Sequence, residues 1–188
     1  MVCHMVSKSR FEELVIPHRN SAFNLAYWIL QSRDDAEDAV QDAYVRAFRA
    51  FDSFVGDGAR SWLLTIVRNV AYSALDLRKR SRNVVMLGAD LRPRSMEDLE
   101  QMASDEPSPE ALVVTHDEHR MLLHSLGKLP LIHRDILVLR EMEGLSYAEI
   151  AEITGTAIGT VMSRLSRARA ELRKALSCQL PKVKSDAL

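Results

Sequence analysis

The stretch GTVMSRLSRARAEL, residues 159–172, combines cations and small polar side chains with a helical apolar period. Its apolar residues recur at steps of four, three and four, which places them on one face of a helix: Val161, Leu165, Ala168 and Leu172. The opposite face carries Met162, Ser163, Ser166, Arg167 and Arg169. Short polar side chains reach base edges in the major groove, and cations beside them bind phosphates. The pattern therefore predicts a DNA-binding helix.

Within this helix, base edges would meet Met162, Ser163 and Ser166. The residues that could reach phosphates are Arg164, Arg167, Arg169, Arg173 and Lys174. An alternative is an amphipathic surface helix whose arginines only face water. The preceding segment favours DNA binding over this alternative, because it has the composition of a first helix and a tight turn.

That preceding segment has the sequence signals of a helix-turn-helix. Ser146 and Glu149 have the spacing of a capping box, so a helix begins there. Gly155 can adopt the positive φ that ends it. Thr160 is the expected N-cap of the second helix. A capped helix, a glycine turn and a second helix with a cationic face are the layout of this motif.

The elements that position this motif are expected to be helical throughout. The chain has 188 residues, 47% of them hydrophobic, with only 7 glycines and 6 prolines and no clear strand alternation. Helices are predicted over residues 10–30, with a break or kink at Pro17, and over residues 32–51 and 60–80, and a glycine-containing loop is predicted over residues 52–59. Two further helices are predicted before the helix-turn-helix, one stopped by Gly127 and Pro130 and one over residues 131–144. The fold class is therefore all-α.

Charge divides the chain into two small helical domains. Residues 97–110, EDLEQMASDEPSPE, contain six acidic residues, no basic residue and two prolines. Such a composition is typical of a flexible tether. We expect a first domain over residues 10–82, an acidic linker over 83–110 and a second domain over 111–178.

Several functional classes have no support in the sequence. Two cysteines, Cys3 and Cys178, form no CxxC pair, and the six histidines form no ligand or nucleophile motif, so we expect no metal, no cofactor and no enzyme activity. The N-terminus lacks an apolar core, and no run approaches the ~20 residues of a membrane span. We therefore expect no membrane insertion and a cytoplasmic protein.

The chain resembles bacterial RNA polymerase sigma factors of the extracytoplasmic-function (ECF) class. Its second domain is similar to region 4 of that class through LP, LREMEGLSYAEIAE and GTVMSRLSRAR in order. Its first domain is similar to region 2 through DAEDAVQDAYVRAFRAF and RSWLLTIVRNVA. The resemblance covers about residues 10–177, with the acidic segment where the family has a variable linker.

The resemblance implies a role for each matching residue. Residues that would bind core RNA polymerase, at its β′ clamp helices, are Asp38, Gln41 and Asp42. Residues that would bind the melted −10 promoter strand are Phe54, Val55, Gly56, Asp57, Gly58, Ala59, Arg68 and Asn69. Residues that would bind −35 duplex DNA are Arg140, Thr160, Met162, Ser163, Ser166 and Arg167. The partners implied are core polymerase (β′ clamp helices and β flap), promoter DNA and an anti-sigma factor.

Three positions depart from the family pattern: Ala157 replaces a frequent proline, Ser73 a frequent aspartate and Met162 a frequent basic residue. Met162 could contact a thymine methyl group. Two other functions remain open on the sequence. One is a plain helix-turn-helix regulator, which leaves the first domain unexplained. The other is a sigma mimic that sequesters an anti-sigma factor, which would be expected to lack the cations and the loop that this chain keeps.

Overall fold

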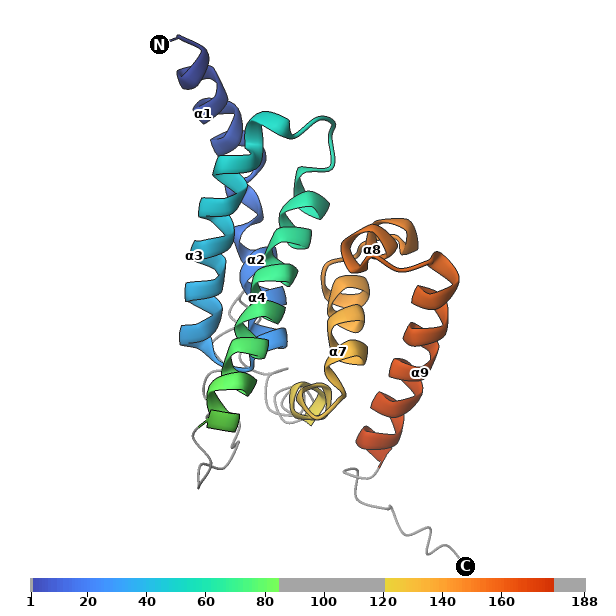
Figure 1. Ribbon diagram of the computed structural model, residues 1–188. Coiled ribbons are helices and arrows are strands. Elements are labelled where there is room, and N and C mark those ends of the chain that lie inside the picture. The colour runs from blue at the N-terminus through green and yellow to red at the C-terminus, as the bar shows by residue number, and fades with distance from the viewer. Residues whose placement is uncertain (1, 85–120, 178–188) are drawn as a thin grey trace, which may run out of the picture.

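The computed structural model describes residues 2–84 and 121–177, and both parts consist of helices joined by short turns (Figure 1). No strand occurs in these two ranges, and the all-α prediction is confirmed. The predicted acidic linker lies outside the described residues apart from its first two positions, which continue a helix.

Four α-helices form the N-terminal domain: α1 (Val2–Leu14), α2 (Arg19–Leu30), α3 (Arg33–Ala50) and α4 (Ala59–Val84). Proline cannot donate a backbone hydrogen bond, and Pro17 lies in a 3₁₀ turn, η1 (Ile16–His18), that separates α1 from α2. The break or kink expected at Pro17 is therefore a break, and it divides this region into two helices. Ser32 caps α3 by accepting a hydrogen bond from the Asp35 amide at 3.4 Å.

The core of this domain lies between α2, α3 and α4. Helix α3 contributes small residues that let the helices approach closely: Ala36, Ala39, Ala43 and Ala47. Larger side chains from the other two helices fill the remaining space: Leu25, Trp28 and Ile29 of α2, and Leu63, Leu64 and Val67 of α4. A second 3₁₀ turn, η2 (Phe51–Ser53), follows α3 and leads into the predicted loop.

The C-terminal domain contains a helical segment at residues 121–127, then α7 (Leu131–Leu137), α8 (Tyr147–Thr154) and α9 (Ile158–Ser177). Helix α7 continues directly into a π-helical turn, η4 (Val138–Met142), which the apolar pattern did not predict. Helix α9 packs on α7 and α8. Their shared core includes Ile136, Leu139, Ile150, Val161 and Leu165.

The two domains are in contact. Helices α7 and α8 lie against α2 and α4, whereas α9 lies on the side of the molecule away from α3 (Figure 1). This arrangement brings polar residues that are more than 60 positions apart within hydrogen-bonding distance.

Candidate nucleic-acid and polymerase interfaces

Helices α8 and α9 form a helix-turn-helix, and local signals explain where α8 begins and ends. The Ser146 hydroxyl accepts a hydrogen bond from the Glu149 amide at 3.2 Å, and the Glu149 carboxylate accepts one from the Ser146 amide at 2.8 Å. This capping box confirms the prediction, and its hydrogen bonds from Ser146 lower the pKa of Glu149. Helix α8 ends at Gly155, which has the expected positive φ of 63°.

The second helix begins earlier than the sequence predicts. The expectation that Thr160 is its N-cap is wrong, because α9 begins at Ile158 and Thr160 lies in its first turn. The amides of Thr160 and Val161 both donate to the Ala157 carbonyl, at 2.9 and 3.1 Å. The helix after Gly155 thus begins three residues sooner than an N-cap at Thr160 would allow, and Thr160 is only partly exposed.

The outer face of α9 has the exposure that base contacts require. Met162 is 53% exposed, and Ser163, Ser166 and Arg167 are exposed as well. The Ser163 hydroxyl donates to the Thr160 carbonyl at 3.0 Å, so its oxygen can still accept a hydrogen bond from a base. These four residues therefore form one continuous surface at the N-terminal half of α9.

Two of the predicted DNA-binding cations already have protein partners. The Arg169 guanidinium donates twice to the Glu141 carboxylate, at 2.6 and 2.9 Å, and this contact raises the pKa of Arg169. The Arg140 guanidinium donates to the Leu145 carbonyl at 2.6 Å and lies 4.9 Å from the centre of the Tyr147 ring. Arg140 thus supports the loop before α8, which limits the orientations in which it can reach DNA.

The predicted −10 loop divides into anchors and an exposed tip. Phe54 is 8% exposed, and its ring stacks on Phe51 at 5.8 Å and contacts Trp62 at 5.0 Å. Val55 is 92% exposed. The rest of the exposed tip is Gly56, Asp57 and Gly58, and Ala59 is buried as the first residue of α4.

Arg68 and Asn69 were both predicted to contact the −10 strand, but the structure gives them different environments. Asn69 is exposed. The Arg68 side chain is only 14% exposed, and its Nε and Nη2 atoms lie 3.0 and 2.9 Å from Oδ2 of Asp135 in α7. The Tyr72 hydroxyl donates to the same oxygen at 2.6 Å. Burial raises the pKa of Asp135, and the Arg68 charge and the Tyr72 hydrogen bond oppose that rise.

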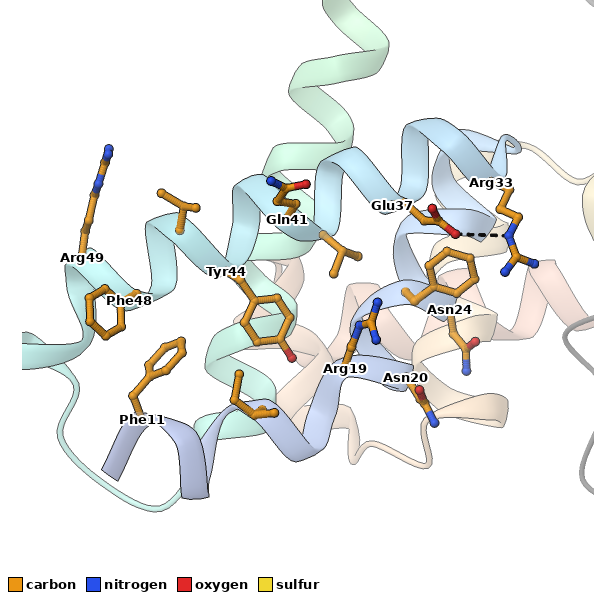
Figure 2. A pocket seen from close by; sticks show the side chains of 14 residues that line it. Phe11, Arg19, Asn20, Asn24, Arg33, Glu37, Gln41, Tyr44, Phe48 and Arg49 are labelled. Carbon is orange, nitrogen blue, oxygen red and sulfur yellow. Dashed lines mark hydrogen bonds and ion pairs between the residues drawn. The ribbon is translucent and has the colours of Figure 1, made fainter. Parts of the chain in front are cut away.

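The predicted polymerase-binding residues of α3 are all exposed. Gln41 also lines a groove between α3 and the α1–α2 segment (Figure 2). Asp42 forms an ion pair with Arg46 at 2.8 Å, one turn further along α3. Asp38 is exposed on the same helix but is not part of the groove lining.

Apolar side chains in the groove were not predicted as functional. Ile16, Val45 and Phe48 line it, and each leaves more than two fifths of its surface in contact with solvent. The groove has a volume of about 1140 Å³. The signal in the sequence was the spacing of Val45 and Phe48, which place apolar groups on α3 outside its alanine face.

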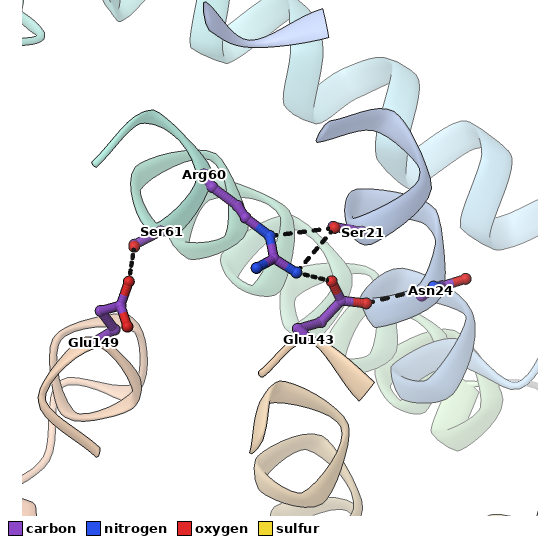
Figure 3. Close-up of polar contacts among 6 residues, drawn as sticks. All are labelled: Ser21, Asn24, Arg60, Ser61, Glu143 and Glu149. Carbon is purple, nitrogen blue, oxygen red and sulfur yellow. Dashed lines mark hydrogen bonds and ion pairs between the residues drawn. The ribbon is translucent and has the colours of Figure 1, made fainter. Parts of the chain in front are cut away.

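A second set of polar contacts joins the two domains near the start of α4 (Figure 3). The Arg60 guanidinium donates to the Glu143 carboxylate and to the Ser21 hydroxyl. Asn24 donates to the same carboxylate at 3.4 Å, and the Ser61 hydroxyl donates to Glu149 at 3.2 Å. These contacts were not predicted from the sequence, because nothing in the local pattern pairs residues 83 or 88 positions apart.

Within residues 2–84 and 121–177, no group of three or more His, Cys, Asp or Glu side chains could hold a metal ion. No helix in those ranges is long and apolar enough to cross a bilayer. The surfaces that remain as candidates are the α9 face, the loop tip and the α3 groove.

Each of the two domains matches a known protein family. The family Sigma-70 region 2 matches residues 14–83, and the family Sigma-70, region 4 matches residues 119–172. The chain is 34% identical over 164 residues to the ECF RNA polymerase sigma-E factor of Haemophilus influenzae, covering 86% of this chain and 85% of that protein. The chain belongs to the ECF sigma factors. The resemblance seen in the sequence is thereby confirmed.

Further comparisons agree with this assignment. The ECF RNA polymerase sigma factor SigE of Mycolicibacterium smegmatis is 33% identical over 169 residues, and the chain covers 62% of its length. Among solved structures, the sigma factor RpoE in complex with the anti-sigma factor NepR from Bartonella quintana matches with a TM-score of 0.70 and 27% identity. That match covers 90% of this chain and 98% of the other. The ECF sigma factor described here therefore has the regions of a transcription initiation factor.

Proposed function

We propose that this sigma factor binds core RNA polymerase and directs it to promoters that region 2 and region 4 recognise together. The observation that supports this most directly is the exposed polar face of α9, which a helix-turn-helix presents at a family-matched position. Region 2 supplies the second recognition surface. RNA synthesis itself is the work of the polymerase, so the protein is not an enzyme, and it acts in the cytoplasm where the chromosome lies.

Polymerase binding is assigned to the surface of α3. Asp38 and Asp42 are exposed acids that complement a basic partner, and the groove beside Gln41 can take apolar side chains. A groove lined with exposed apolar side chains on one helix suits binding of a partner helix, as the β′ clamp helices would provide. The family resemblance also implies a contact with the β flap of the polymerase.

Promoter recognition is assigned to two exposed surfaces. The tip residues Val55 to Gly58 bind the melted −10 strand, because glycine backbone permits close approach of an unstacked base. Phe54 and Ala59 hold the two ends of that tip. Asn69 and, once it is released from Asp135, Arg68 contact the same strand.

The −35 duplex is assigned to α9. Ser163, Ser166 and Arg167 donate or accept hydrogen bonds in the major groove, and Met162 offers an apolar contact to a thymine methyl group. Thr160 and Arg140 contact the phosphate backbone at the edge of this surface. To reach a phosphate, the Arg140 guanidinium must give up its hydrogen bond to the Leu145 carbonyl, which requires the loop before α8 to change its conformation.

An anti-sigma factor is the third proposed partner. The structurally similar RpoE of Bartonella quintana was solved with the anti-sigma factor NepR. The apolar residues of the α3 groove and the contact between regions 2 and 4 offer surfaces that such a protein could bind. Isolation of this sigma factor from its host together with polymerase, but never with a small inhibitor, would count against this partner.

Run-off transcription tests the proposal. Core polymerase is mixed with fragmented genomic DNA, with and without the protein, and compared with a variant carrying Ser163→Ala, Ser166→Ala and Arg167→Ala. We expect discrete new transcripts that the variant loses, since loss of each good base contact costs about 1–3 kcal/mol of discrimination. Lys128→Ala, an exposed cation of region 4 outside α9, is the control and should keep the transcripts.

Two other outcomes have definite meanings. Neither transcripts nor polymerase binding would contradict the sigma assignment and favour a plain regulator. Polymerase binding without transcripts at any fragment would favour a mimic that sequesters an anti-sigma factor.

A further inference from the structure

In the polar contacts between the two regions, region 2 provides the hydrogen-bond donors and region 4 provides the acceptors. Region 2 supplies the donors along one side of α4, namely Arg60, Ser61, Arg68 and Tyr72. Region 4 supplies the acceptors, and all three are carboxylates: Asp135, Glu143 and Glu149. A protein surface rich in cationic and hydroxyl donors is also what a DNA backbone requires. Region 4 thus occupies with carboxylates a surface that suits phosphates.

Asp135 is the most enclosed of these acids. It is 1% exposed, and a single oxygen, Oδ2, accepts from Arg68 and from Tyr72. The Arg68 guanidinium also lies 4.3 Å from the centre of the Tyr72 ring, which restricts its orientation. A buried carboxylate needs its partners, because an unpaired charge in this setting is unfavourable. The contact is therefore specific to the docked arrangement.

Glu143 makes the second enclosed contact. Its side chain is 4% exposed, and it accepts from Arg60 of α4 and Asn24 of α2 (Figure 3). Both donors belong to region 2, so Glu143 finds these partners only when the regions are docked. Glu149 is held mainly by Ser146 in its own region and adds a weaker contact through Ser61.

We propose that region 4 docks on the DNA-facing side of α4, with Asp135 and Glu143 in the place of promoter phosphates, and that this closes the free sigma factor without any partner. The inference rests on the proposed function, because it identifies α4 as a DNA-facing helix. In the closed form Arg68 is engaged by Asp135, so region 2 cannot use it on the −10 strand. Polymerase and promoter must separate the regions before initiation.

The closed form leaves the −35 surface of α9 exposed but engages two arginines of α4. The α9 surface of Met162, Ser163, Ser166 and Arg167 remains exposed while Arg60 and Arg68 are engaged. The free protein should therefore keep its −35 surface and its −10 loop tip accessible, and withhold only the contact that Arg68 makes with the −10 strand. This distinguishes self-closure from a general loss of DNA binding.

Small-angle X-ray scattering and amide hydrogen exchange of the free full-length chain test the closure. The test variant is Asp135→Asn with Glu143→Gln, and the control is Glu141→Gln, an acid whose ion pair with Arg169 lies within region 4. We expect the wild type and the control to be compact with slow exchange along residues 60–72. The double variant should have a larger radius of gyration and faster exchange there. An extended wild type, or a double variant as compact as wild type, would overturn the proposal.

A reversible cross-link between the regions provides a second test, which does not depend on whether the double variant folds. A Cβ placed on Gly127 would lie 3.2 Å from the Gln31 side chain, so these positions face each other across the regions. Gln31→Cys and Gly127→Cys are introduced with Cys3→Ser and Cys178→Ser, and a short reducible bismaleimide joins them. We expect transcription to be lost in the cross-linked protein and restored by reductant. The reagent should not affect the parent that lacks the new cysteines.

The outcomes separate the two proposals. Undiminished transcription by the cross-linked protein would overturn self-closure while leaving the sigma assignment intact. A second outcome is that the free wild-type chain is compact and the double variant opens, but the wild type gives no transcript. Closure would then stand as a property of the fold. Its role in transcription initiation would fail together with the proposed function.

Discussion

Phe54 and Val55 are neighbours in the loop before α4, yet their side chains have opposite environments. Phe54 packs on Phe51 and Trp62, whereas Val55 is 92% exposed. Phe54→Ala should cost about 3 kcal/mol of the free energy of unfolding, because it removes a buried ring and leaves a cavity. Val55→Ala should change it by less than about 0.5 kcal/mol. Urea unfolding followed by tryptophan fluorescence measures both, since Trp62 lies beside the cavity.

The same pair separates stability from function. If Val55 lies at the −10 surface, Val55→Ala should reduce transcription without altering the unfolding curve. Equal stability losses for the two variants would show that the loop tip is packed in solution. Full transcription by Val55→Ala would remove this side chain from the proposed −10 contact.

At the scale of elements, the turn between α8 and α9 requires a glycine at position 155 but not at position 159. Gly155 has a φ of 63°, whereas Gly159 lies within α9, where an added Cβ would meet nothing within 4 Å. Gly155→Ala should destabilise the protein by about 1 kcal/mol, since an L-residue is strained in the left-handed region. Gly159→Ala should stabilise it by about 0.5 kcal/mol, because it lowers the entropy of the unfolded chain at no steric cost.

Thermal unfolding followed by far-ultraviolet circular dichroism tests this pair. The two alanine variants should shift the midpoint in opposite directions. Destabilisation by Gly159→Ala would mean that α9 does not begin at Ile158 in solution, and that Thr160 is nearer the true start of the helix.

At the scale of the whole molecule, docking couples the stability of region 4 to that of region 2. Both tryptophans, Trp28 and Trp62, lie in region 2, so their fluorescence reports that region alone, whereas circular dichroism reports both. In the wild type the two probes should give one coincident transition. Asp135→Asn should cost region 4 about 2 kcal/mol, roughly 10 °C in its midpoint, so that the two curves separate.

Glu141→Gln serves as the control for this measurement, because its ion pair is exposed and lies within region 4. Its curves should stay coincident. Separate transitions already in the wild type would show that the regions unfold independently, and coincident curves in Asp135→Asn would show that Asp135 does not couple them.

Local signals in the sequence were sufficient for most of the helices. The capping box at Ser146 and Glu149, the turn at Gly155 and the alanine face of α3 depend on residues a few positions apart, so their physics is readable in the chain itself. The errors lie where backbone geometry depends on packing. The start of α9 at Ile158 and the π-helical turn η4 follow from how these segments fit against neighbouring helices, which no local period encodes.

What the sequence determined by itself was the helical class, the two-region organisation and the exposed face of α9, because each follows from composition or short-range spacing. Only the tertiary structure decided which groups are engaged. Arg68 pairs with Asp135 across 67 positions, and Arg60 with Glu143 across 83. Such pairs depend on how the two regions dock, and docking is governed by surface complementarity between side chains that no periodic pattern along the chain connects.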